Sequence, residues 1–366
     1  MKKNLVVLTT GGSGGHVFPA EAVATYLKKE KYDLAFITDR RGQKRINGTL
    51  ASIKNYSVCA SSVSGRSFFG KFLAFFKLGI GTLQAIRILL KLRPNLVVGF
   101  GGYASIPAVL AAQFLHIPVV LHEQNAILGK ANRLLARRTK LIATSFTPTG
   151  QIPSLAKTVQ TGMPVRPQIL EQKDSPYPND NKEFHLLIIG GSQGARAFSD
   201  ILPKALVALS PELKGKLVLT QQVRAEDMDR VEEEYRNSGI KSLNIAPFFN
   251  NIPDLLSKAH LIISRSGSSS LAEFSMVGRP ALLIPLPTAA DNHQTANARI
   301  WTETGSGWLI VEKGATPESI TTRITDLMEN PETLKRAAEC AKQSKPKISA
   351  DEALAKEIIK ILKDKK

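Results

Sequence analysis

Residues 5–16 read LVVLTTGGSGGH, and residues 185–196 repeat the arrangement as HLLIIGGSQGAR. In each stretch an apolar run of strand character enters a glycine cluster, and the cluster opens a helix-like segment. Glycine adopts φ > 0 and carries no Cβ, so its backbone can approach a ligand closely. The unpaired N–H groups at the start of a helix attract anions. The duplication therefore predicts two similar α/β halves that hold a phosphorylated ligand between them.

Strand-like apolar runs alternate with longer helix-like runs through the whole chain. This alternation predicts parallel sheets built from βαβ units. The fold class is α/β, with two doubly wound Rossmann-like domains that face a cleft at the carboxyl ends of their strands. We expect one domain over residues 1–163, a second over 164–345, and a C-terminal helix over 349–366 that packs back on the first. Segment 172–182, rich in Pro and Asn, is typical of an exposed linker.

The expected elements are short strands and helices of ordinary length. The expected strands are 4–10, 33–38, 95–99, 117–121, 140–144, 185–190, 216–221, 243–246, 260–264, 281–285 and 307–311. The expected helices are 16–30, 70–92, 104–115, 127–137, 194–208, 225–237, 268–277, 292–303, 316–328, 331–343 and 349–363. The uncharged run 96–121 has the length of a membrane span. Its glycines, with Pro107 and Pro118, favour a strand, a turn, a helix and a second strand instead.

The composition is that of a globular protein, with 43% hydrophobic and 22% charged residues. Cys59 and Cys340 lie far apart and the chain has only six histidines, which argues against a structural zinc site or a disulfide framework.

Residues 1–163 hold 22 Lys and Arg against 5 Asp and Glu, so this half carries +17 of the net +18. Such asymmetry indicates a polyanionic partner, either nucleic acid or anionic lipid; a solvated basic face without a partner is the alternative.

Five of the 15 phenylalanines fall within residues 68–76: Phe68, Phe69, Phe72, Phe75 and Phe76. On a helix with 100° per residue they cover an arc of about 120°. Lys71 and Lys77 flank this arc on opposite sides. The layout is typical of a helix lying in a bilayer interface, and the net charge of +17 over residues 1–163 would add attraction to anionic lipid. The alternative is a helix with its rings in the core of the domain.

Several polar residues stand directly after predicted strands. His16, where the first glycine cluster becomes a helix, is either a general base or a helix-terminal hydrogen bonder. The first cluster lacks the third glycine of a dinucleotide fingerprint, although Asp39 beside Arg40 and Arg41 keeps a nicotinamide enzyme as a minor alternative. Neither cluster ends in Gly-Lys-Ser/Thr, which disfavours a P-loop nucleotidase.

Two further groups of polar residues belong to the same edges of the predicted sheets. In the first half these are Gly101-Gly102-Tyr103 and His122-Glu123-Gln124-Asn125, and a core would have to satisfy all four polar groups of the second motif. In the second half Ser264-Arg265-Ser266-Gly267 precedes a helix that carries Glu273. That carboxylate suits the two hydroxyls of a ribose; its alternative role is to complement the helix dipole.

The order and spacing of these motifs resemble one family of bacterial peptidoglycan glycosyltransferases, over residues 4 to about 345. Its members transfer N-acetylglucosamine from UDP-N-acetylglucosamine to undecaprenyl-pyrophosphoryl-N-acetylmuramyl-pentapeptide. The pieces that carry the resemblance are 11–19, 101–103, 122–125, 162–166, 190–196, 265–273 and 291–294. The chain departs from the family at Ser13, where Thr is common, at Ala126, where Gly is usual, at the polar run 268–270, and at His293, which is often Gln.

The resemblance implies an inverting glycosyltransferase of the B architecture whose acceptor is the muramyl 4-hydroxyl. It implies a peripheral enzyme at the cytoplasmic face of the inner membrane, bound to an anionic membrane surface, with no nucleic acid partner, no cofactor and no metal. Two alternatives stay open: a UDP-sugar epimerase of the same architecture, and a basic membrane-binding module without catalysis.

The resemblance also implies roles for individual residues. His16 is the catalytic base, Phe248 and Phe249 match a uracil-binding pair, and Glu273 matches the ribose acid. The residues implied at UDP-N-acetylglucosamine are Ser13, Gly14, Gly15, His16, Asn125, Arg166, Ser192, Gln193, Phe248, Phe249, Ser270, Glu273, His293 and Gln294. The residues implied in the acceptor and diphosphate loops are Gly12, Gly101, Gly102, Tyr103, Glu123 and Gln124. The membrane patch comprises Phe68, Phe69, Lys71, Phe72, Phe75, Phe76 and Lys77.

Overall fold

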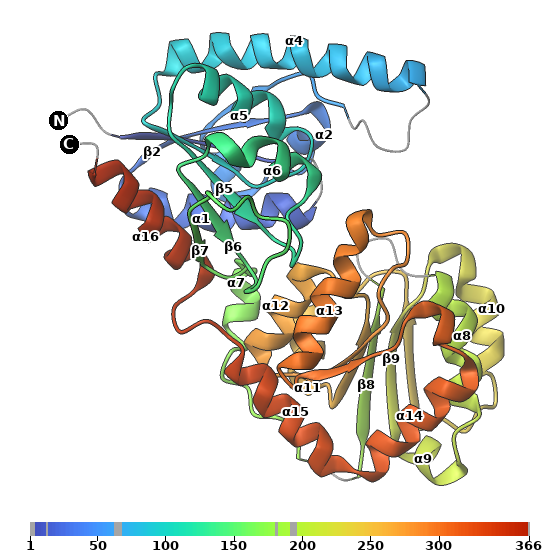
Figure 1. The fold of residues 1–366 in the computed structure, drawn as a ribbon. Helices are drawn as coiled ribbons and strands as arrows, with labels where there is room; N and C mark the ends of the chain where they lie inside the picture. Colours follow the sequence, from blue (N-terminus) through green and yellow to red (C-terminus); the bar gives the residue numbers. More distant parts are fainter. Residues whose placement is uncertain (1–3, 12–13, 62–67, 180–181, 191–195, 365–366) are drawn as a thin grey trace. The chain divides into compact units, whose positions relative to one another are not determined.

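A computed structural model describes residues 4–11, 14–61, 68–179, 182–190 and 196–364. The chain divides into two compact units, each described here by itself (Figure 1). Unit 1 comprises residues 1–166 and 346–366, and unit 2 comprises residues 167–345. The chain therefore leaves unit 1, forms unit 2 and returns to unit 1.

Unit 1 is built on a parallel sheet with the strand order β3-β2-β1-β4-β5-β6-β7. The direction of strand addition reverses between β1 and β4, and ligands of doubly wound folds bind at such a switch point. The strands are β1 (Leu5–Thr9), β2 (Asp33–Thr38), β3 (Lys54–Ser57), β4 (Leu96–Gly99), β5 (Val119–Glu123), β6 (Leu141–Thr144) and β7 (Thr158–Gln160).

Helices cover both faces of this sheet (Figure 1). Because successive side chains of a strand point to opposite faces, Val6 and Leu8 pack with α1 and α16, whereas Val7 packs with α4 and α5. The helices of unit 1 are α1 (Gly14–Lys29), α2 (Arg40–Gln43), α3 (Gly48–Ala51), α4 (Phe68–Leu92), α5 (Ser105–Phe114), α6 (Lys130–Leu135), η1 (Ala136–Arg138) and α16 (Ala350–Lys363).

Unit 2 repeats this plan with the strand order β10-β9-β8-β11-β12-β13, again all parallel. Its switch point lies between β8 and β11. The strands are β8 (Phe184–Ile189), β9 (Leu217–Gln222), β10 (Ser242–Ala246), β11 (Leu261–Ser264), β12 (Ala281–Leu283) and β13 (Gly307–Leu309). The helices are α7 (Pro167–Leu170), α8 (Arg196–Val207), α9 (Pro211–Lys216), η2 (Ala225–Asp227), α10 (Met228–Tyr235), α11 (Ile252–Lys258), α12 (Ser268–Val277), η3 (Ala290–Asn292), α13 (His293–Glu303), η4 (Glu312–Gly314), α14 (Pro317–Glu329) and α15 (Pro331–Gln343).

The prediction of two doubly wound parallel sheets is confirmed. The uncharged run 96–121 forms β4, α5 and β5, so a membrane span at this position is excluded. The expected helix 127–137 is shorter and continues as a 3-10 turn, and helix 225–237 likewise begins with one. Two strands escaped prediction. β3 and β7 are edge strands with partly exposed, polar sequences, so no apolar run marks them.

The expected linker 172–182 is wrong in one respect, because its described part lies within unit 2 and is anchored there. The buried Arg279 uses all five N–H groups on carbonyl oxygens. Its Nη2 donates to Pro176 O at 2.7 Å and to Ser257 O at 2.6 Å, and the remaining bonds reach Leu256, Val277 and Gly278. Burial lowers the pKa of Arg279 to about 10, so the guanidinium stays charged at neutral pH. Arg279 therefore anchors segment 172–182 to unit 2 through the carbonyl of Pro176, although the composition of the segment is typical of an exposed linker.

Candidate functional site

The glycines of unit 1 bring two loops into backbone contact at the switch point of the sheet. Gly11 follows β1, and its N–H donates to Gly101 O at 2.9 Å. A Cβ on Gly11 would lie 2.9 Å from Gly102 Cα, a distance that side chains do not tolerate. Gly101 and Gly102 adopt φ of +79° and +75°, which favours glycine further. Each loop therefore requires glycine because the other loop lies against it.

His16 lies over this crossing of the two loops. It stands in the first turn of α1 and is half-buried. A Cβ on Gly102 would lie 3.2 Å from His16 Cδ2, so the imidazole rests directly on the glycine backbone. The predicted base is thus at the carboxyl ends of β1 and β4. Gly14 and Gly15 begin the same helix, whereas Gly12 and Ser13 lie outside the described residues.

The motif His122-Glu123-Gln124-Asn125 ends β5, and its buried polar groups bind other parts of unit 1. Gln124 Nε2 donates to Phe100 O at 3.1 Å. Glu123 Oε1 accepts the N–H of Asn125 at 2.9 Å and its Nδ2 at 3.3 Å. Glu123 Oε2 accepts the N–H of Gly129 at 2.9 Å and Asn132 Nδ2 at 2.8 Å. The carboxylate therefore holds the loop that connects β5 to α6.

His122 is a buried neutral imidazole. A carbonyl oxygen only accepts, so Nε2 donates to Gly162 O at 3.0 Å and Nδ1 carries no proton. The pKa of His122 is lowered to about 4, mainly by burial and to a smaller extent by the charge of nearby His16, while the bond to Gly162 O acts in the opposite direction. This bond fixes Gly162, with φ of +82°, near the end of the first part of unit 1. Nδ1 has no hydrogen-bond partner among the described residues.

In unit 2 a loop after β11 is held from three neighbouring segments. Arg265 is buried and its Nη1 donates to Ile284 O at 2.9 Å and Pro285 O at 3.1 Å, while Nη2 pairs with Glu312 at 2.5 Å. Ser266 Oγ donates to Gln294 O at 2.7 Å, and Asn297 Nδ2 donates to Ser266 O at 3.0 Å. The carboxyl ends of β11 and β12 and the start of α13 thus form one bonded assembly.

The predicted donor residues of unit 2 lie around this assembly. Ser270 and Glu273 are half-buried on α12, which begins directly after the loop. Phe248 and Phe249 follow β10 and differ in exposure: Phe248 is 66% exposed and Phe249 only 9%. The ring of Phe248 alone is thus largely open to solvent in this pair.

α13 begins with His293 and Gln294 after a turn that two consecutive residues make in the left-handed region. Asp291 and Asn292 have φ of 52° and 54°, and Thr295 Oγ1 donates to Asn292 Oδ1 at 2.6 Å. His293 Nδ1 lies 2.7 Å from Ala290 O, and Gln294 Oε1 accepts the N–H of Leu286 at 2.9 Å. The side-chain oxygen of Gln294 therefore binds the segment that follows β12.

Apart from Arg166, the described residues that were predicted to bind the substrates lie near the carboxyl ends of the strands of unit 1 or of unit 2. Arg166 ends the first part of unit 1 and is half-buried. Ser192 and Gln193 lie outside the described residues. Sequence reasoning missed Asn132 and Asn297, buried amides whose only signal is a polar residue within an otherwise apolar helical pattern. Within the described ranges, no group of three or more His, Cys, Asp or Glu side chains is arranged to hold a metal ion.

The helix α4 presents a row of aromatic rings to solvent. Phe72, Phe75 and Phe76 are 69%, 63% and 61% exposed, so the alternative that they lie in the core is wrong. The side chains of Phe68, Phe69 and Lys71 lie outside the description, and Lys77 is exposed. Residues 72–92 are long and apolar enough to cross a membrane by length and composition alone. The opposite side of α4, through Ala85 and Leu89, packs in the core of unit 1, as in a surface helix.

Comparison with protein families assigns both units. Residues 6–144 match the glycosyltransferase family 28 N-terminal domain, and residues 185–353 match the glycosyltransferase family 28 C-terminal domain. The chain belongs to glycosyltransferase family 28. The resemblance drawn from the sequence motifs is confirmed, and so is the conclusion that this is a glycosyltransferase.

Relatives of this family 28 chain extend over almost its whole length. One from Rhodospirillum rubrum is 46% identical over 92% of this chain and 87% of its own, and one from Paramagnetospirillum magneticum is 43% identical over 99% and 98%. Both are named UDP-N-acetylglucosamine–N-acetylmuramyl-(pentapeptide) pyrophosphoryl-undecaprenol N-acetylglucosamine transferase. The crystal structure of Acinetobacter baumannii MurG covers 98% of this chain and 99% of its own, with a TM-score of 0.81 and 30% identity.

Proposed function

We propose that this family 28 enzyme transfers N-acetylglucosamine from UDP-N-acetylglucosamine to the 4-hydroxyl of undecaprenyl-pyrophosphoryl-N-acetylmuramyl-pentapeptide, with inversion at the sugar carbon. The nearly full-length similarity to relatives that are named for this transfer carries the proposal. The site geometry supports it, because each unit offers a switch-point edge with polar groups of the expected kinds. Unit 1 takes the acceptor and unit 2 takes the UDP-sugar.

His16 is the catalytic base of the proposed transfer. The acceptor oxygen forms a bond to the sugar C1 while the bond from C1 to the diphosphate breaks, and the acceptor proton passes to the imidazole. UDP leaves with the bonding electrons. Its added negative charge is stabilised by Arg166 and by the N-terminal N–H groups of a helix. The glycine crossing under His16 keeps side chains away from the place where the acceptor would lie.

The donor contacts are assigned to unit 2. Phe248 offers its exposed ring for the uracil, whereas Phe249, its neighbour in the sequence, is buried. Glu273 accepts hydroxyls of the ribose, and Ser270 lies one turn earlier on α12 for a phosphate. His293 and Gln294 recognise the sugar from the start of α13. Ser192 and Gln193 complete the proposed donor set.

Unit 1 is proposed to lie on the cytoplasmic face of the inner membrane through α4. The exposed rings of Phe72, Phe75 and Phe76 would enter the acyl boundary, with Lys77 among the phosphates. The net charge of +17 over residues 1–163 adds attraction to anionic lipid, about 1 kcal/mol for each nearby cation. A lipid-linked acceptor would meet the enzyme at this surface.

The test is UDP release from UDP-N-acetylglucosamine by the purified chain, with and without a lipid-linked muramyl-pentapeptide acceptor. Release that depends on the acceptor, together with a β-1,4-linked disaccharide product, is the expected result. Conversion of the UDP-sugar to an epimer without acceptor would favour the epimerase alternative. Vesicle binding without detectable UDP binding would favour the non-catalytic module.

A further inference from the structure

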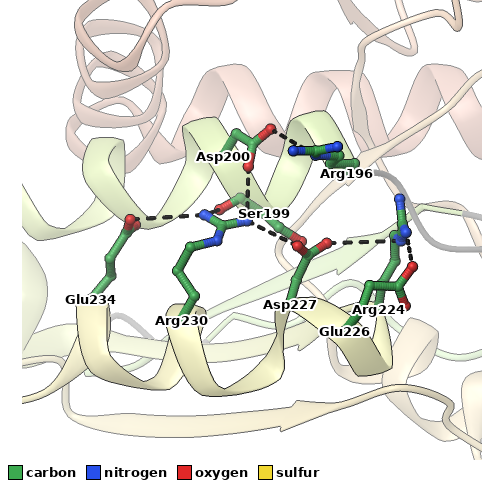
Figure 2. Close-up of polar contacts among 8 residues, drawn as sticks. All are labelled: Arg196, Ser199, Asp200, Arg224, Glu226, Asp227, Arg230 and Glu234. Carbon is green, nitrogen blue, oxygen red and sulfur yellow. Dashed lines mark hydrogen bonds and ion pairs between the residues drawn. The ribbon is translucent and has the colours of Figure 1, made fainter.

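The two helices α8 and α10 of unit 2 are joined by a network of ion pairs centred on Arg230 (Figure 2). Arg230 Nη2 lies 2.8 Å from Asp200 Oδ1 on α8 and 3.1 Å from Asp227 Oδ1 at the start of α10. Arg196 pairs with the other oxygen of Asp200 at 3.8 Å. Glu234 lies 3.9 Å from Arg230 Nη1, so one guanidinium faces three carboxylates.

Arg230 also donates to a backbone oxygen, and this bond replaces one that the helix itself has lost. In an α-helix the carbonyl of Ser199 accepts the N–H of the residue four positions later. That residue is Pro203, which has no N–H. Arg230 Nη1 donates to Ser199 O at 3.1 Å, so it supplies the missing donor from the neighbouring helix.

The turn that Arg230 holds is in contact with the donor loop of unit 2. Phe198 precedes Ser199 on α8 and is buried. The guanidinium carbon of Arg265 lies 4.8 Å from the centre of the Phe198 ring, which makes a cation–π contact. Arg265 belongs to the bonded assembly that directly precedes α12. The helix α12 carries Ser270 and Glu273. A continuous set of contacts therefore connects α10 with the proposed donor site. It runs from Arg230 to Ser199, and from the neighbouring Phe198 to Arg265.

We propose that Arg230 is a positioning residue of the UDP-sugar site. By donating to the carbonyl that Pro203 leaves without its helical partner, it fixes the first turn of α8 and hence the place of Arg265. This inference rests on the proposed function of unit 2, since it presupposes that UDP binds there. Arg230 acts through α8 and not by contact with the ligand. Asp227, whose side chain is 10% exposed, holds the guanidinium from its own helix.

The first experiment is Arg230→Met, which removes the donors and keeps an apolar stem. We expect the Kd for UDP in calorimetry and the KM for the UDP-sugar to rise about 5- to 30-fold, because small displacements of a site are costly. The acceptor KM should stay within about twofold. Arg230→Lys, which keeps a charged donor, should restore part of the affinity. The matched control is Arg236→Met at the C-terminal end of α10, which breaks the exposed pair with Glu233 and should change neither constant.

The second experiment gives the lost donor back. Pro203→Ala restores an N–H four residues after Ser199, so Arg230→Met in that background should cost less than about a third of its effect in the wild type. An equal effect in both backgrounds would overturn the inference, as would an Arg230→Met protein that binds UDP like the wild type. If the wild type itself binds no UDP, the proposed function fails instead. Thermal unfolding of each variant separates lost affinity from lost folding.

Discussion

Glu123→Gln distinguishes a structural carboxylate from a catalytic one at the end of β5. The substitution keeps the size of the side chain and replaces one acceptor oxygen with an NH₂ group. Each oxygen of Glu123 accepts two N–H donors, at 2.9 and 3.3 Å on Oε1 and at 2.9 and 2.8 Å on Oε2. Whichever way the amide turns, two donors in a buried site therefore face another donor.

The expected cost is set by those two bonds. A hydrogen bond to a charged group contributes about 1.5–3 kcal/mol, and Gln would give up the Oε1 side, which has the longer bond. The free energy of unfolding of unit 1 should therefore fall by about 3 kcal/mol, which for a domain of this size lowers the Tm by about 6–12 °C. Hydrogen exchange should increase in residues 124–132, which Glu123 holds.

The measurements are calorimetric unfolding and turnover of the folded variant. Glu30→Gln is the matched control, because Glu30 is an exposed carboxylate of the same unit. We expect turnover of folded Glu123→Gln to fall by less than the roughly 10²-fold that loss of a general base costs. A variant with wild-type stability and turnover reduced beyond that would refute the structural role and make Glu123 the base.

His16→Ala should lower turnover about 10²- to 10⁴-fold while UDP affinity in calorimetry stays within a few-fold, because a positioned base acts on the acceptor proton. Near-normal turnover would assign that proton to another group. Glu273→Ala should raise the KM for the UDP-sugar at least about tenfold through loss of charged hydrogen bonds to the ribose; unchanged UDP affinity would leave Glu273 as a helix-dipole residue. His122 takes up a proton near pH 6.5 in the unfolded chain but only near pH 4 in the folded protein. The free energy of unfolding should therefore fall by up to about 3 kcal/mol as the pH drops from 6.5 to 4, and it should recover as the pH rises again. His122→Gln should flatten that dependence in urea titrations, and equal slopes in both proteins would contradict the assignment. Phe72→Ser combined with Phe75→Ser should weaken binding to anionic vesicles with a Tm change below about 2 °C, since both rings are exposed; a large Tm loss with unchanged vesicle binding would argue against the membrane surface.

The central strands of both sheets could be predicted because they are buried on both faces. Such strands read as unbroken apolar runs, as in Val6–Leu8 and Leu186–Ile189. Glycine follows the first run at Gly11, where the loop of Gly101 and Gly102 comes close. The edge strands β3 and β7 carry no such signal, because one side of each lies in solvent. Segment 172–182 misled for a related reason: its proline and asparagine content says nothing of Arg279, about a hundred residues later, which anchors it.

The sequence predicts where the residues of the candidate site lie along the strands, but it does not predict which groups they contact. The motifs marked the carboxyl ends of the strands, where His16 and Glu123 lie. The sequence does not reveal that loop 124–132 folds back to give Glu123 four donors. It displays Pro203 four residues after Ser199, but only the packing of α10 on α8 shows which side chain replaces the missing N–H. Long-range partners of this kind follow from tertiary structure alone.

The discontinuity of unit 1 has a consequence for synthesis on the ribosome. Its sheet emerges early, whereas α16, whose Leu354 and Ile358 pack with Val6 and Leu8, is translated only after all of unit 2. At about 5–20 residues per second, the intervening residues 167–345 take roughly 10–40 s to make. During that interval the nascent unit 1 exposes the apolar strip that α16 will cover. Unit 2, continuous in sequence, can complete its own core first, so the later unit finishes folding before the earlier one.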